Sequence, residues 1–353
     1  MSIPIVSMDE AGQTGQNLLD LHQPVFTLAS VDLDEDEAIE LIGRSEAELH
    51  FVKARKNPAG RTQIVELLNA LPAHRVKTVT INKPFMTTCK IVDQLIEPQM
   101  AAEGIDGYAD GSLLALANVW HFCCDAAVGP TFLPDLHRLF VAAVGKGDES
   151  AVDRFYDLLG EAVKNAKLEL PAMEEMWLYS REQFLDSMDA QALPVLEPGV
   201  PAAQALVYEW AKVHPTGFEV RHDHRNEIAG WLERLGVYYG SDQAPTEFRF
   251  RDGLTINLPV PVTTFGTAGS DEHPSIQIAD VVASATTYLL RDRLSGESSN
   301  QFAADLSATP VLEFVSTESS LWPDADFLDA PPEPGPAGEF DRIIDWLRNV
   351  DSD

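Results

Sequence analysis

One helical segment has the residue pattern expected around a functional carboxylate. In Pro274–Thr287 the apolar residues cover most faces, and apart from Ser275 and Thr286 the polar residues form one narrow stripe, namely Gln277, Asp280, Ser284 and Thr287. A carboxylate in such a buried helix is costly unless it is paired, hydrogen-bonded or bound to metal. We therefore predict a catalytic or metal-binding role for Asp280. The alternative is a structural bond to a basic side chain or a backbone donor.

Two further acids stand near the start of the chain. Asp9 and Glu10 follow the apolar run 3–8, which predicts a strand, and Gly12 comes two residues later. They are thus expected at the C-terminal end of a strand, where a glycine lets a ligand approach the backbone. The alternative is a turn carboxylate that caps nearby amides.

A third candidate, Asp223, closes a predicted strand at 218–221 and precedes a predicted helix. An aspartate there is also a natural helix N-cap. Its neighbours His222 and His224 titrate near neutral pH, so they are candidates for proton transfer or metal binding, although a single histidine is more often a surface residue.

Glu48 is the fourth candidate. It ends the segment 45–48, whose Ser-Glu-Ala-Glu pattern is a capping box that predicts the start of a helix. Helix capping explains Glu48 without any function. If Glu48 faces the site instead, the same helix places Lys53, Arg55 and Lys56 beside it for phosphate binding.

The elements that must position these residues alternate between strands and helices, which predicts an α/β fold. We expect a hairpin from 3–8 and 25–31, helices at 34–42 and 62–71, a strand at 76–81, helices from about 91 to 210, a strand at 218–221, a helix at 228–235, a hairpin around 252–253 and a last core helix from Pro274. The predicted organisation is a core in two parts, 1–90 and 214–296, a helical insertion at 91–213, and an acidic, proline-rich tail at 297–353 with a short terminal helix.

Net charge restricts the possible partners. The 353 residues carry a formal charge of −31, which argues against non-specific coating of nucleic acid. The stretch 49–93 is an exception, with eight basic residues against two acids. This basic island is either a polyanion-binding surface or the solvated faces of a helix and a strand.

Location and redox state are also constrained. No basic leader followed by a long apolar run opens the sequence, and no window approaches a membrane span, so we expect a cytoplasmic protein without membrane contact. Cys89, Cys123 and Cys124 form no zinc-binding spacing and are expected to be reduced, buried residues.

The order of these motifs resembles a known family. Asp9-Glu10-Ala11-Gly12 near the start and Gln277-Ile278-Ala279-Asp280 near the end resemble the uncharacterised family called domain of unknown function 3800. The segments 48–50 and 220–223 are similar to its middle and later elements. Two features differ from the family pattern: Ala11 replaces a serine, and only two predicted strands precede Glu48 where ribonuclease H folds place three.

The resemblance implies a ribonuclease H-like mixed sheet flanked by helices, with a large helical insertion. In that fold, carboxylates from the first strand, a helix, a later strand and the final helix converge on two Mg²⁺ or Mn²⁺ ions. Carried over to this chain, the catalytic and metal-binding residues would be Asp9, Glu48, Asp223 and Asp280, supported by Glu10 and Gln277.

The first functional hypothesis is therefore a divalent-metal-dependent nuclease acting on DNA or RNA. Phosphate contacts would come from Lys53, Arg55, Lys56 and Lys83, and His222 or His224 would aid proton transfer. A second hypothesis is a non-catalytic binding or regulatory module that meets a protein partner through the insertion or tail. A third is a phosphatase acting on small phosphorylated molecules.

Overall fold

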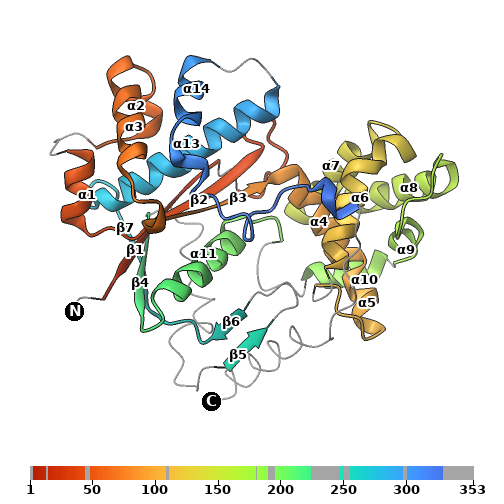
Figure 1. Cartoon of the computed structure of the whole chain (residues 1–353). Helices are drawn as coiled ribbons and strands as arrows, with labels where there is room; N and C mark the ends of the chain where they lie inside the picture. Colours follow the sequence, from red (N-terminus) through yellow and green to blue (C-terminus); the bar gives the residue numbers. More distant parts are fainter. Residues whose placement is uncertain are drawn as a thin grey trace.

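The computed structural model describes most of the chain, and it confirms the predicted α/β class. A mixed five-stranded sheet has helices on both faces (Figure 1). The described residues are 3–12, 15–43, 48–108, 111–179, 181–189, 195–223, 246–249, 255–296 and 300–328.

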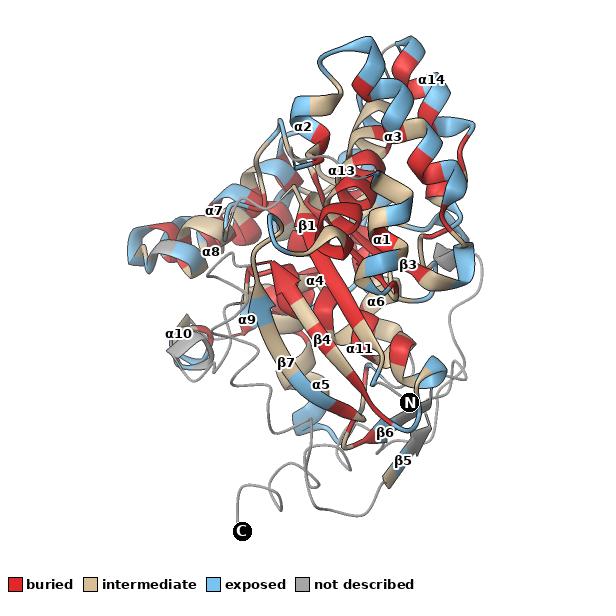
Figure 2. Ribbon diagram, turned by 90° about the vertical axis from the view of Figure 1, so that its left-hand side faces the viewer, coloured by how far each residue is buried: buried red, intermediate tan, exposed pale blue. Residues whose placement is uncertain are grey.

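The sheet has the order β3-β2-β1-β4-β7. Strands β1 (Ile5–Ala11), β2 (Val25–Val31) and β3 (Val76–Asn82) pair antiparallel, whereas β4 (Phe218–Asp223) and β7 (Val262–Ala268) continue the sheet in parallel from β1. Strand β1 is buried on both faces at the centre (Figure 2), which explains its continuous apolar run. Strand β7 was not predicted, because its partly exposed, threonine-rich edge position gives no alternating apolar signal.

One face of the sheet is covered by α13 (Pro274–Ser295), which lies across β1 and β2. Its apolar residues pack with Ala29 and Val31 of β2 in a separate core cluster. Outside it lie α1 (Glu35–Ile42), α2 (Phe51–Ala54), α3 (Pro58–Ala70) and the short η1 (Ala73–Arg75). Helix α1 begins at the capping box formed by Asp34 and Glu37, as the acidic pattern there favours.

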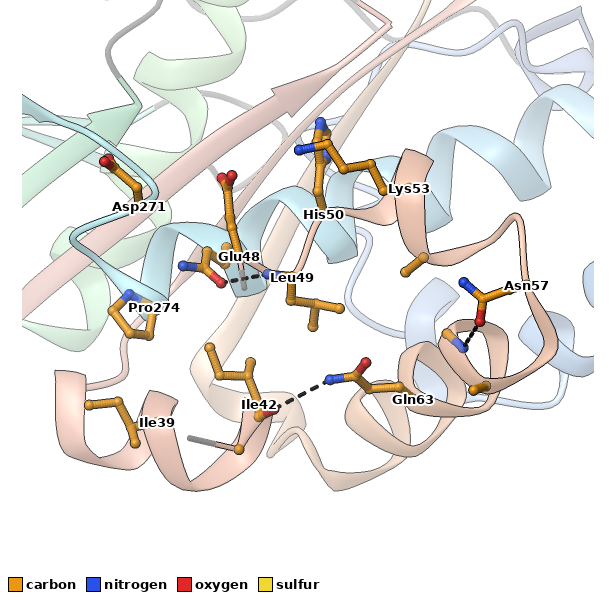
Figure 3. A pocket seen from close by; sticks show the side chains of 15 residues that line it. Ile39, Ile42, Glu48, Leu49, His50, Lys53, Asn57, Gln63, Asp271 and Pro274 are labelled. Carbon is orange, nitrogen blue, oxygen red and sulfur yellow. Dashed lines mark hydrogen bonds between the residues drawn. The ribbon is translucent and has the colours of Figure 1, made fainter. Parts of the chain in front are cut away.

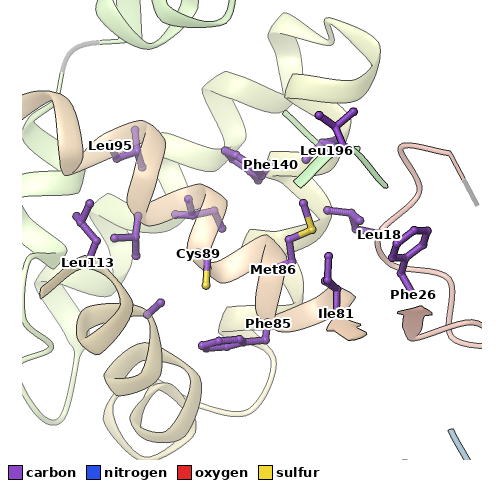
Figure 4. Packing of buried hydrophobic residues seen from close by; sticks show 14 of the residues in the cluster. Leu18, Phe26, Ile81, Phe85, Met86, Cys89, Leu95, Leu113, Phe140 and Leu196 are labelled. Atoms are coloured by element: carbon purple, nitrogen blue, oxygen red, sulfur yellow. The ribbon is translucent and has the colours of Figure 1, made fainter. Parts of the chain in front are cut away.

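The helices between β3 and β4 lie on the side of the opposite face. These are α4 (Lys83–Leu95), α5 (Glu97–Ala102), α6 (Ser112–Ala127), α7 (Phe132–Lys146), α8 (Glu149–Asn165), α9 (Met173–Leu178), α10 (Arg181–Asp189) and α11 (Gly199–Val213). Of these, α11 and α4 contact the sheet directly, while the others pack on α4 or on one another. Phe26 and Ile81 of the sheet pack in one core with Phe85 and Met86 of α4 (Figure 4). No helix in the described ranges combines the length and apolar character needed to cross a bilayer.

A two-stranded ribbon, β5 (Thr246–Arg249) and β6 (Thr255–Leu258), is antiparallel as expected for the predicted hairpin. Residues 250–254, where the turn was expected, and the helix expected at 228–235 lie outside the described residues.

The residues after 300 differ from the predicted tail. Helix α14 (Gln301–Ser307) and the short η3 (Pro310–Leu312) bury Phe302, Leu306 and Phe314 in the α13 core, and η4 (Ala325–Leu328) follows. The next segment covers the β3 edge, where the Thr78 amide donates to the Phe314 carbonyl at 2.9 Å. Residues 300–322 therefore belong to the core, and the predicted terminal helix lies outside the described residues.

Candidate active site

Two of the predicted acids end neighbouring strands on the face covered by α13. The Ser7 hydroxyl lies 2.8 Å from that of Ser275 on α13, so Asp9, two residues along β1, points to the same face. On β4, Arg221 contacts Glu35 on this face, and Asp223 is again two residues further. Strands β1 and β4 are parallel, and Met8 pairs with His222. Asp9 and Asp223 each follow one residue later, so they lie on adjacent strands near the C-terminal ends of both.

The charges of these acids act on one another. Asp9 is only 4% exposed. Burial raises the pKa of Asp9 well above its usual range, and the charges of Glu10, Asp280 and Asp223 raise it further, while the Glu10 amide donates to Asp9 Oδ1 at 2.8 Å. The structure thus brings Asp9, Asp223 and Asp280 together from two strands and a helix.

Asp280 has three polar partners. His50 Nδ1 lies 2.8 Å from Asp280 Oδ2, the Phe51 amide donates to the same oxygen at 3.2 Å, and the Ser284 hydroxyl donates to Oδ1 at 3.1 Å. The hydrogen bond to Asp280 raises the pKa of His50. The structural alternative considered for Asp280, a bond to a basic side chain and a backbone donor, is therefore present.

His50 was not predicted to be a site residue. It stands two residues after Glu48, in the segment that was chosen for its acid. Its imidazole occupies the place beside Asp280 where the carboxylate of Glu48 was expected.

Glu48 itself lies elsewhere. Residues 48–50 are not helical, because α2 begins at Phe51, and Ser45 lies outside the described residues. The exposed Glu48 accepts a hydrogen bond from the Ser270 hydroxyl at 2.7 Å and lines a neighbouring cavity. Glu48 is not among the groups that raise the pKa of Asp9, although its charge helps to raise the pKa of His50 beside Asp280.

Gln277 connects the segment 48–50 to α13. Its side-chain carbonyl accepts from the Leu49 amide at 3.0 Å, and its side-chain amide donates to the Ser270 carbonyl at 2.7 Å. Gln277 therefore positions the segment 48–50 and the loop that contains Ser270 beside the acids. A supporting role of this kind was expected for Gln277.

Glu10 and His222 lie on the opposite face of the sheet. Glu10 Oε2 and His222 Nε2 are 3.2 Å apart, without hydrogen-bond alignment, and His222 is fully buried. Burial opposes protonation of His222, but Glu10 outweighs it and the pKa of His222 is raised. A fully buried imidazole under the sheet cannot exchange protons with a substrate, so the predicted role of His222 is not supported. His224 lies outside the described residues.

Basic and aromatic side chains lie together along α2, α3, α13 and α14, and the first amide of α2 donates to Asp280. The guanidinium carbons of Arg55 and Arg291 lie 5.3 and 5.8 Å from the centre of the Tyr288 ring, and that of Arg61 lies 5.5 Å from the centre of the Phe302 ring. Within the described residues, the five cations of this group form no ion pair with a carboxylate. We call it the basic–aromatic surface: Lys53, Arg55, Lys56, Arg61 and Arg291 with the half-buried Tyr288 and the buried Phe302.

Lys83 does not belong to this surface, contrary to the prediction. It is fully buried at the start of α4. Burial lowers the pKa of Lys83 to about 8, against the opposing effect of Asp20 and Glu197. Because Lys83 is buried in the core, it cannot contact a phosphate together with Lys53, Arg55 and Lys56.

The donor chemistry of the three acids fits a hard divalent cation. Carboxylate oxygens are the ligands that Mg²⁺ and Mn²⁺ prefer, and the mutual repulsion that raises the pKa of Asp9 is the kind of interaction such a cation offsets. In their present positions, however, no three Asp, Glu, His or Cys side chains of the described residues are arranged to hold a metal ion. Binding would require adjustment at Asp280, whose Oδ2 is engaged by His50 and the Phe51 amide.

Comparison of the chain with protein-family models, with curated proteins and with solved structures finds no match. We therefore infer the function from the geometry of the site.

Proposed function

We propose that this protein is a divalent-metal-dependent phosphodiesterase that cuts nucleic acid. The observation that carries the proposal is the convergence of Asp9, Asp223 and Asp280, the last of which accepts a hydrogen bond from the first amide of α2, one of the helices of the basic–aromatic surface. Acids drawn from separate elements repel one another, and a protein core tolerates such a cluster when it serves a function.

Asp9, Asp223 and Asp280 would hold the metal. A bound divalent cation supplies charge stabilisation of a phosphoryl oxygen and lowers the pKa of a coordinated water. His50 and Ser284 fix the orientation of Asp280, and Gln277 fixes the loop that carries His50.

The basic–aromatic surface supports a polyanionic substrate over a small phosphorylated one. Its five cations lack carboxylate partners within the described residues, in a chain whose formal charge is −31. The guanidinium groups of Arg55 and Arg61 lie over aromatic rings, and an arginine held in this way can still direct N–H groups that are not otherwise bonded to a phosphate. A nucleic acid strand would thus be held beside the acids and repelled by most of the remaining surface.

The arrangement of elements supports a ribonuclease H-like assignment. The acids come from the first strand, a later strand of the same sheet and the last helix packed on it, as the family resemblance implied. Strand β3 supplies the third antiparallel strand, although α1, α2 and α3 precede it in the chain.

Two measurements test the proposal. Purified protein with Mg²⁺ or Mn²⁺ is expected to cut single- or double-stranded DNA or RNA, and Asp280→Asn is expected to lose about 100-fold or more of that activity, because a transition-state charge interaction is removed. Titration calorimetry should detect Mn²⁺ binding to the wild type and much weaker binding to Asp9→Asn and Asp280→Asn. Asp36→Asn, an exposed acid in the first turn of α1 and outside the cluster, is the matched control.

A non-catalytic binding module is the second candidate. It is favoured by the existing bonds from Asp280 to His50 and the Phe51 amide, which satisfy this carboxylate without metal. Absence of both Mn²⁺ binding and cleavage, combined with a stable protein complex, would establish this second function.

A further inference from the structure

A cavity of about 900 Å³ opens between α1, α2, α3 and the start of α13 (Figure 3). This volume is in the range of small-molecule sites, roughly 300–1,000 Å³. The residues that line it come from elements before and after the segment 48–50 in the chain. This segment ends at His50, which contacts Asp280 of the acid cluster.

The cavity and the acids share a wall. His50 lines the cavity and at the same time lies 2.8 Å from Asp280. Gln277, one helical turn before Asp280, lines it as well. A ligand group in the cavity is therefore directly adjacent to a phosphate placed at the acids.

The wall chemistry favours a flat, uncharged group. Ile39, Ile42, Leu49 and Pro274 provide apolar contact, and Figure 3 shows the two isoleucines on the opposite side of the cavity from the polar ends of Glu48, His50 and Lys53. Apolar surface of this kind stabilises the faces of an aromatic ring system.

The charges of the wall disfavour a phosphate in the cavity. Glu48 and Asp271 contribute two carboxylates, against the ammonium of Lys53 and the imidazole of His50. Carboxylates instead accept hydrogen bonds from the exocyclic amino groups of bases. The acid cluster and the basic–aromatic surface would bind the phosphates, and the cavity would bind the base.

We propose that this cavity takes one unpaired nucleobase of the strand whose phosphate lies at the acids. This inference rests on the proposed function and specifies its substrate: a single strand, or a duplex with a locally unpaired nucleotide. A base inside a duplex cannot enter a pocket walled by helices without leaving its stack, which costs a few kcal/mol.

The test fills the cavity with a large side chain. Ala59→Trp and Gln63→Trp both enter it from α3, and Ala70→Trp, exposed at the other end of the same helix and outside the cavity, is the matched control. Fluorescence anisotropy with a labelled single-stranded oligonucleotide in EDTA measures binding without catalysis. A second probe is bis(4-nitrophenyl) phosphate with Mn²⁺, a phosphodiester without a base.

We expect wild type to bind the single strand more tightly than its duplex, and each cavity variant to lose about tenfold in single-strand affinity, as expected when one base contact is lost. Ala70→Trp should bind like wild type, and all variants should hydrolyse the base-free diester equally. Unchanged binding by both cavity variants, or a preference of wild type for duplex, overturns the inference. Loss of binding in the variants together with no hydrolysis of either substrate by wild type would refute the proposed function and retain the base site.

Discussion

Asp9 is almost fully buried, and burial first and then three neighbouring carboxylates raise its pKa. The ionised form of Asp9 is therefore less favourable in the folded protein than in the unfolded chain. This is the opposite of a salt-bridged aspartate, whose ionisation stabilises a fold. A residue that lowers stability at neutral pH and stands at a strand end beside other acids has the character of a functional group.

The pH dependence of stability follows from this shift. Because the pKa of Asp9 is raised in the folded state, its destabilising effect is absent below its ordinary value of 3.8, grows as the pH rises from there to the folded pKa, and is constant above it. Asp9→Asn removes this effect. We expect its Tm at pH 7.5 to exceed that of wild type by about 2–4 °C, and the gain to shrink toward pH 4.

The control for this prediction is Asp36→Asn, an acid in the first turn of α1. Thermal unfolding followed by circular dichroism across pH 4–8 is the measurement. A lower Tm for Asp9→Asn at pH 7.5 would show that Asp9 is held by a favourable interaction, and the electrostatic account of the site would be wrong.

At the level of elements, sequence patterns predicted what depends on local chemistry. The short acidic helix α1, the helical spacing of α13 and the buried strands β1 and β2 were all found close to their predicted positions. Strand β7 was missed because an exposed edge strand needs no alternating apolar pattern.

The remaining differences depend on tertiary contacts that local patterns do not specify. The capping-box pattern at 45–48 predicted a helix containing Glu48, but Gln277 holds the Leu49 backbone in an irregular segment that ends at α2. Lys83 was grouped with surface cations by sequence proximity, whereas its place directly after β3 buries it. Convergence of Asp9 with Asp280 was predicted only from the family resemblance, since nothing local fixes which strand a helix crosses.

The misassigned tail gives a prediction at this scale. Phe302 of α14 is 4% exposed, and its ring centre lies 6.2 Å from that of Phe51 and 5.7 Å from that of Tyr288. Phe302→Ala should therefore lower the free energy of unfolding by about 3–5 kcal/mol, the usual cost of removing a buried aromatic ring. Gln301→Ala, an exposed neighbour, should change it by less than about 0.5 kcal/mol. Urea unfolding measures both, and equal effects would place 300–322 outside the cooperative core.

At the scale of the whole molecule, charge is distributed unevenly. The formal charge is −31, yet the stretch 49–93 carries eight basic residues against two acids. Folding does not expose all of them on one surface, because Lys83 is buried and Arg75 and Lys77 pair with carboxylates. It does add Arg291 from α13, so the basic–aromatic surface combines cations from the two ends of the sequence.

Such a surface predicts a measurable dependence on salt. Each phosphate contact releases counterions, so the logarithm of single-strand affinity should fall with the logarithm of salt concentration, with a slope of about −0.7 per contact. We expect Arg61→Gln and Arg291→Gln each to weaken oligonucleotide binding and to reduce the magnitude of that slope by about 0.7. Arg138→Gln, an exposed arginine on α7 paired with Asp135, should leave the slope unchanged.

Anisotropy titrations between 50 and 300 mM KCl measure these slopes. Tm values must accompany them, because Arg61 also donates to the Arg55 carbonyl and Arg291 to the His22 carbonyl. Variants that keep the wild-type Tm and the wild-type slope would show that the five cations do not contact the strand. In that case the acidic remainder of the molecule would repel any polynucleotide, and a small phosphodiester would be the better substrate for the three acids.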